Sequence, residues 1–152
     1  MPTYSIRDAD YDDIPAVADL AKQFFIETRL SMLGGILDDR MVEDLTADLI
    51  YMDDGMVKVG IDNSGRIVGI VSGILIGHML FAGPKVAQEP MWYVLPDHRN
   101  SKLGLKLLKA YEDWARDRGC KHCIVDCLDP SIEGLISKLG YKAMERKFIK
   151  EL

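Results

Sequence analysis

Long apolar stretches are missing from this sequence of 152 residues. The longest uncharged apolar run, residues 67–77, is far shorter than the roughly 20 residues that a membrane-spanning helix needs. The N-terminus also lacks the basic stretch and apolar core of a secretion signal. We therefore expect a cytoplasmic chain with no membrane partner.

Cysteine is scarce as well, and all three residues fall in one short segment: Cys120, Cys123 and Cys127. A disulfide framework would need an even number spread along the chain. A redox Cys-x-x-Cys pair opens a helix, whereas Cys120 follows a predicted helix. A zinc site would need a fourth ligand, and the nearby His122 lies on the wrong face of the predicted strand to join Cys123. We expect reduced thiols and no bound metal; a redox or zinc protein is the alternative.

Positive charge is in deficit, because 19 Lys and Arg residues oppose 24 Asp and Glu residues and leave a net charge of −5. This balance argues against a general nucleic-acid-binding surface. Apolar residues make up 48% and charged residues 28%, which is typical of a soluble globular protein. The length fits one domain spanning residues 1–152.

The periodicity of the apolar residues predicts an α/β protein with helices packed on a mixed sheet. The expected order is β-α-α-β-β-β-α-β-α-β(-β). Helical spacing predicts helices over residues 12–28, 38–52, 104–118 and 132–139, the last of them capped by Ser131. Strand patterns predict strands over residues 3–7, 56–61, 67–76, 86–95 and 123–125, with one or two closing strands over residues 142–150.

Pro90 lies inside the predicted strand over residues 86–95. Proline has no N–H to donate to a neighbouring strand, so this strand should bulge or splay there. The splay would leave part of the neighbouring backbone unpaired.

Residues 92–105 read as a strand, a short polar loop and the start of an amphipathic helix. The free N–H groups in the first turn of a helix attract anions, especially phosphates. Gly104 would let a phosphate approach the backbone closely. Arg99 and Lys102 add positive charge to an otherwise acidic chain.

This segment resembles the pyrophosphate loop of the GNAT N-acetyltransferase superfamily, whose motif is Arg/Gln-x-x-Gly-x-Gly/Ala after a strand ending Val-x-Pro. Val94-x-Pro96, Arg99 and Gly104 match that motif, and the element order matches the fold along nearly the whole chain. The Leu-Gly-Tyr sequence at residues 139–141 is similar to the family's ending of the last helix.

The resemblance implies an acyltransferase that moves an acetyl group from acetyl-CoA to a primary amine by direct attack in a ternary complex. The backbone N–H of Val94 would polarise the thioester carbonyl, and the backbone of Trp92 and Val94 would bind the pantetheine arm. Together with these two strand residues, the loop would form the cofactor-binding set: Arg99, Asn100, Ser101, Lys102, Leu103, Gly104 and Leu105.

Two departures from the family pattern matter. Lys102 replaces the first motif glycine, although in a helical backbone any residue supplies the same N–H. Ile136 replaces the tyrosine that often protonates the leaving thiolate, and Asp129 lies close to the position of a usual asparagine.

An attacking amine must lose a proton, since a free alkylamine has a pKa of about 10.4. Glu89, just before the splay, is the first candidate for the catalytic base, and His78 and Asp126 are the others. Tyr141 or Tyr93 could replace the missing catalytic acid, unless water reaches the thiolate directly.

The acceptor is expected against the first two helices. The second helix is rich in carboxylates that would favour a cationic amine: Asp38, Asp39, Glu43, Asp44 and Asp48. Residues 79–81 would either wall the acceptor cleft or pair with a second subunit in a homodimer. An acyl-CoA sensor without turnover is the alternative function.

Overall fold

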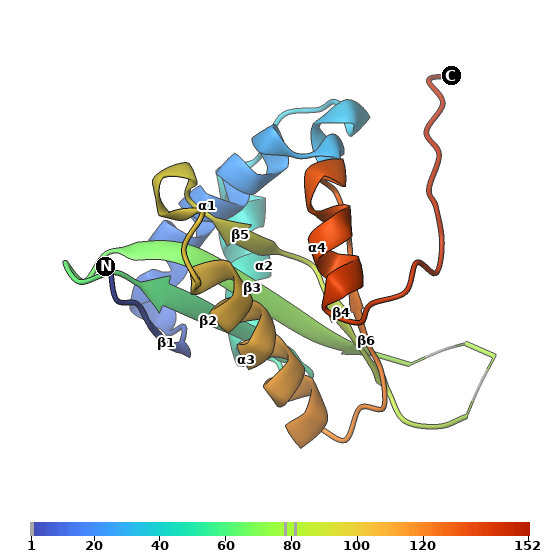
Figure 1. The fold of residues 1–152 in the computed structure, drawn as a ribbon. Helices are drawn as coiled ribbons and strands as arrows, with labels where there is room; N and C mark the ends of the chain where they lie inside the picture. Colours follow the sequence, from blue (N-terminus) through green and yellow to red (C-terminus); the bar gives the residue numbers. More distant parts are fainter. Residues whose placement is uncertain (1, 78, 81) are drawn as a thin grey trace.

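The chain folds into one mixed sheet with helices on both faces, as described by a computed structural model of residues 2–77, 79–80 and 82–152 (Figure 1). The strands are β1 (Ser5–Asp8), β2 (Gly55–Ile61), β3 (Ile67–Ile76), β4 (Val86–Glu89), β5 (Trp92–Val94) and β6 (Cys123–Val125). The helices are α1 (Ile14–Glu27), α2 (Asp39–Tyr51), α3 (Leu103–Asp117) and α4 (Glu133–Lys138). Four short 3₁₀ turns, η1 (Tyr11–Asp13), η2 (Arg29–Leu33), η3 (Pro96–His98) and η4 (Pro130–Ile132), connect them.

The strand order is β1-β2-β3-β4-β6, with β5 paired to β3. Only the β4–β6 pair is parallel among the strand pairs of the described residues. In Figure 1, α3 crosses one face of the sheet and α1 and α2 cover the other. The α/β fold predicted from the sequence is confirmed.

Two glycines let α3 lie directly on the sheet. A Cβ atom added at Gly60 would come within 2.6 Å of Leu103 Cδ1, and one at Gly73 within 2.6 Å of Trp114 Cζ3. Atoms at such a distance would overlap. A side chain at either glycine would therefore push α3 away from the sheet, because the packed interior has no spare room. The close contact at Leu103, which is fully buried, fixes where α3 begins.

The predicted splay at Pro90 is confirmed. The single strand expected over residues 86–95 is two strands, because β4 ends at Glu89 and β5 begins at Trp92. Both pair with β3, but only β4 continues to β6. The sheet therefore opens between β5 and β6.

The closing strands predicted over residues 142–150 are absent, since the described chain has no regular secondary structure after residue 140. This part of the chain runs away from the sheet (Figure 1), and Phe148 is 92% exposed. No strand of the described chain is paired with this segment to receive its hydrogen bonds.

A second correction concerns the start of the last helix. The Asp129 side chain, not Ser131, provides the cap, and it accepts a hydrogen bond from the Ser131 amide at 2.9 Å. No helix in the described part of the chain is long and apolar enough to cross a membrane.

Candidate active site

The outer edge of β5 carries backbone groups that the sheet does not use. The amide of Leu95 donates to the carbonyl of Val68 on β3 at 2.9 Å. Because backbone groups alternate in direction along an antiparallel strand, those of Trp92 and Val94 point away from β3. The N–H groups of these two residues therefore face the gap left by the splay. This is the direction expected if they are to bind an extended arm of the donor.

The β5 edge leads into a tight loop that presents the start of α3. Asn100 adopts a left-handed conformation with φ of 57°, which asparagine tolerates better than most residues. The Ser101 hydroxyl donates to the His98 carbonyl at 2.6 Å and accepts from the Leu103 amide at 3.2 Å. Lys102 is the N-terminal cap residue, with no side-chain capping bond.

The first turn of α3 leaves the amides of Gly104 and Leu105 without partners inside the helix. The indole N–H of Trp92 donates to the Gly104 carbonyl at 3.0 Å, which fixes this turn to β5. A Cβ atom added at Gly104 would meet the nearest protein atom only at 3.8 Å, an ordinary contact. Nothing in the chain itself requires a glycine here, so the open space is available to a ligand.

The Arg99 side chain ties the loop to the end of α1. Its Nε donates to the Val94 carbonyl at 2.8 Å, and its Nη2 donates to Glu27 Oε2 at 2.6 Å. The Tyr93 hydroxyl donates to Glu27 Oε1 at 2.7 Å, and the Arg99 guanidinium lies 5.2 Å from the Tyr93 ring centre. Arg99 thus positions the loop with its side chain rather than holding it out toward a phosphate.

This network shifts two pKa values. Burial acts to raise the pKa of Glu27, but the hydrogen bonds from Arg99 and Tyr93 outweigh it and lower that pKa. Burial, together with the bond to Glu27, raises the pKa of Tyr93 to about 12. Glu27 is therefore a carboxylate and Tyr93 a neutral phenol at neutral pH.

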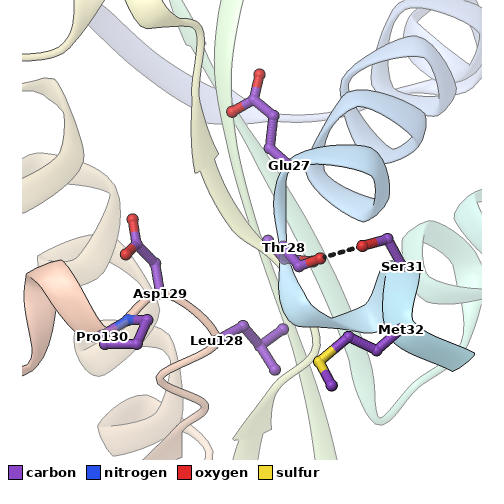
Figure 2. A pocket seen from close by; sticks show the side chains of 7 residues that line it. All are labelled: Glu27, Thr28, Ser31, Met32, Leu128, Asp129 and Pro130. Carbon is purple, nitrogen blue, oxygen red and sulfur yellow. Dashed lines mark hydrogen bonds between the residues drawn. The ribbon is translucent and has the colours of Figure 1, made fainter.

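A pocket of about 380 Å³ lies beside this network (Figure 2). Its lining residues come from the end of α1, from η2 and from the chain that follows β6: Glu27, Thr28, Ser31, Met32, Leu128, Asp129 and Pro130. In Figure 2, Glu27 and Asp129 extend from opposite sides of the pocket. The carboxylates predicted to face the acceptor are on α2, but those that line the pocket are Glu27 and Asp129.

Glu89, the first candidate for the base, ends β4 at the splay and is 2% exposed. Burial raises the pKa of its carboxyl well above the usual value, and the neighbouring Asp126 carboxyl adds to this effect. A hydrogen bond from the Asp126 backbone opposes the shift. A carboxyl with a raised pKa is suited to accept a proton near neutral pH. Glu89 lies at the splay but is not part of the pocket lining.

The structure does not bring Tyr141 to the splay. Its hydroxyl donates to Glu112 Oε1 at 2.7 Å and lies 3.6 Å from Cys123 Sγ, where β6 begins. Burial and the bond to Glu112 raise the pKa of Tyr141 strongly. Its geometry gives no support to the predicted role as catalytic acid. His78, an alternative base, lies outside the described residues.

Sequence reasoning missed Glu27 entirely. It is the last residue of α1, where a single glutamate carries no motif, and its role depends on contacts with residues about 70 positions away. Only the folded chain reveals that it joins the loop to the pocket.

The α/β fold thus brings together an open backbone edge, a helix start with free amides and an adjoining pocket. Comparison with known families gives the particular class. The model of the Acetyltransferase (GNAT) family matches residues 16–141, so the chain belongs to this family. It is an acetyltransferase that uses acetyl-CoA as its donor, as the resemblance of the loop predicted.

Similar proteins agree with this assignment. An aminoglycoside N(6')-acetyltransferase type 1 from Klebsiella aerogenes is 55% identical over 29 residues, which is 19% of this chain and 19% of that protein. Aminoglycoside N-acetyltransferase AAC(6')-Iy, solved with CoA, has a TM-score of 0.78 at 16% identity, covering 100% of this chain and 96% of its own. Glucosamine-6-phosphate N-acetyltransferase from Arabidopsis thaliana has a TM-score of 0.76 at 20% identity, covering 98% of each chain. These two structures support the fold.

Proposed function

We propose that this acetyltransferase moves the acetyl group of acetyl-CoA directly to the primary amine of an acceptor held in the same complex. The observation that carries the proposal is the outward-facing backbone of Trp92 and Val94, which leads straight to the free amides of Gly104 and Leu105. One edge thus offers hydrogen bonds to an extended amide-bearing arm and then to a diphosphate.

The donor fits these residues. The open space above Gly104 and the helix N-terminus suit phosphate oxygens, because free N–H groups and the helix dipole both favour negative charge. The exposed Lys102 adds a cation at the same end of α3. When bound, acetyl-CoA supplies an activated acetyl group as a thioester.

The chain's own residues then have two tasks. The Val94 N–H stabilises negative charge that develops on the acyl oxygen, as the donors of an oxyanion hole do. Glu89 accepts the proton that the amine must lose, directly or through water, because its carboxyl lies at the splay with a raised pKa.

For the acceptor we propose a small cationic amine bound in the pocket between Glu27 and Asp129. The pocket volume of about 380 Å³ is in the range of small-molecule sites. The Asp129 carboxylate would attract an ammonium group of the acceptor other than the reacting one. Glu27, whose charge Arg99 balances, would add hydrogen-bond acceptors. The aminoglycoside acetyltransferases among the similar proteins act on acceptors of this chemistry, as their names state.

The proposal is tested by Val94→Pro, which removes the outward N–H without breaking a bond to β3. Proline is tolerated at such outward positions of an edge strand. Removal of one oxyanion donor should lower kcat by about 10²–10³-fold. The dissociation constant for CoA should change far less.

Val94→Ala is the matched control, since it shortens the side chain and keeps the N–H. It should retain kcat close to that of the parent. Thiol release is measured with a panel of amines, CoA affinity by calorimetry and folding by thermal melting. A folded Val94→Pro variant with unchanged kcat would contradict the proposed role of this amide.

A further inference from the structure

We propose that Glu27 is a positioning residue that holds Arg99 away from the donor in the free protein and releases it when a cationic acceptor enters the pocket. Donor and acceptor would then each strengthen the binding of the other. The inference rests on the proposed function, because it takes the diphosphate to lie at the start of α3 and the acceptor to lie between Glu27 and Asp129.

The Glu27 carboxylate touches both of the proposed binding sites. Its Oε2 accepts a hydrogen bond from Arg99 Nη2 at 2.6 Å, and its Oε1 accepts one from the Tyr93 hydroxyl at 2.7 Å. The same side chain lines the pocket, opposite Asp129 (Figure 2). A cation that binds Glu27 therefore competes directly with Arg99, whose Nε also donates to the Val94 carbonyl at 2.8 Å.

Both partners of this ion pair lie where their own charge is poorly placed. Glu27 is the last residue of α1, whose last turn contains no basic residue, and a carboxylate is unfavourable at the negative end of a helix. Arg99 belongs to the loop that leads to Lys102 and the positive start of α3. Each group therefore gains from a partner of opposite charge, and in the free protein that partner is the other group.

The ion pair can be separated at small cost. The side chain of Arg99 is 45% exposed and that of Glu27 is 37% exposed. Ion pairs that water reaches in this way contribute little to stability. The hydrogen bonds from Arg99 and Tyr93 lower the pKa of Glu27, so at neutral pH it carries the charge that a cation would seek.

The charges of the two ligands match the two partners of the pair. The diphosphate of the donor is an anion that attracts Arg99, and an ammonium group of the acceptor is a cation that attracts Glu27. The first ligand to bind must separate the pair, whereas the second finds it already separated. Such coupling is reciprocal by thermodynamic necessity and typically changes an affinity by about 5- to 150-fold.

The first test measures the direction in which donor affinity changes when Glu27 loses its charge. Glu27→Gln keeps the length of the side chain and an oxygen for the Tyr93 hydroxyl, but it no longer holds Arg99 by charge. The dissociation constant for CoA, measured by calorimetry, should fall about fivefold, because Arg99 is free to meet the diphosphate. Pantetheine, which lacks the diphosphate, should bind the parent and the variant equally. If Glu27 only braced the loop, CoA would bind the variant more weakly; that result, or an unchanged constant, would overturn the proposal.

Two controls separate the ion pair from the effect of charge in general. Asp97→Asn removes one negative charge from an exposed position of the same loop and should change the dissociation constant for CoA by less than about twofold. In an Arg99→Gln protein, which keeps an N–H donor for the Val94 carbonyl, adding Glu27→Gln should bring no gain in affinity. An equal gain in both backgrounds would contradict the role of Arg99. Thermal melting verifies that each variant folds.

The second test measures the coupling itself, with spermidine as the cationic probe of the pocket. CoA carries no acetyl group, so its binding can be followed without turnover. Spermidine should lower the dissociation constant of the parent for CoA about fivefold and should leave that of Glu27→Gln nearly unchanged. Equal effects on both proteins, or no effect on the parent, would overturn the coupling. The proposed function is judged separately, because CoA binding and acetyl transfer that depends on the Val94 amide do not require the two ligands to be coupled.

Discussion

Glu89 illustrates how a single residue can be chosen from the sequence while its environment cannot. Its place before Pro90 is readable from the chain, since proline interrupts a strand. Its near-complete burial and the proximity of Asp126 arise from the pairing of β4 with β6, which links residues 36 positions apart. The raised pKa is therefore a property of the fold.

Glu89→Gln should separate catalysis from stability. The pKa of Glu89 is raised in the folded state, so the folded chain binds more protons than the unfolded chain between the two pKa values. Stability therefore falls as pH rises through this window, and the substitution should remove that loss. The variant should melt at the same or a higher temperature than the parent above neutral pH.

Catalytic activity should fall in Glu89→Gln, although stability should not. The rate of the parent should rise with pH as Glu89 loses its proton, and in Glu89→Gln kcat should fall by about 10²–10⁴-fold and lose that rise. The measurements are kcat from pH 5 to 9 and thermal melts over the same range. A variant that keeps the parent's pH profile would exclude Glu89 as the base.

Among the elements, sequence patterns predicted those proposed to bind the donor and missed the contacts that depend on residues distant in the sequence. Val94-x-Pro96 and the amphipathic helix after it are local signals, and α3 begins at Leu103, one residue before the predicted start. The splay between β4 and β5 was predicted from Pro90 alone. The link from Arg99 to Glu27 has no local signal, because it joins a loop to the end of another helix. The strand predicted over residues 142–150 is absent from the structure, because a strand needs a neighbouring strand to receive its hydrogen bonds.

Substitutions at Gly104 test the phosphate site proposed at the start of α3, because their effects on helix stability and on CoA affinity should differ. Alanine at this position has room and should stabilise the helix by up to about 1 kcal/mol. The GNAT motif accepts alanine at this position, so Gly104→Ala should keep CoA affinity close to that of the parent. The larger side chain of Gly104→Val would occupy the space proposed for a phosphate, and CoA affinity should fall about tenfold, or about 1.4 kcal/mol. Gly134→Val in α4 is the matched control, since a Cβ atom there also meets open space. Calorimetric titration with CoA and thermal melting measure the two effects. If Gly104→Val binds CoA as the parent does, the phosphate does not lie against this turn.

Over the whole molecule, charge acts differently on the two substrates. The chain carries a net charge of −5, and two carboxylates line the pocket, whereas the α3 start concentrates backbone N–H groups and Lys102. A polycationic acceptor is therefore attracted by the molecule as a whole, while an anionic donor depends on one local site. Such long-range attraction is screened by salt over about 10 Å at 0.1 M.

Ionic strength should consequently distinguish acceptors by their number of charges. With a polyamine acceptor, kcat/KM should fall by roughly fivefold or more between 0.02 and 0.5 M salt, because screening weakens attraction to Asp129 and the acidic surface. A monoamine of similar size should lose less than about twofold, since its single ammonium must be deprotonated to react and contributes little binding. In both cases kcat at saturation should stay nearly constant, because salt changes encounter and binding rather than the chemistry proposed at Glu89 and Val94. Initial rates at fixed, saturating acetyl-CoA measure both quantities. Equal salt dependence for the two acceptors would show that the carboxylates of the pocket do not select the charge of the substrate.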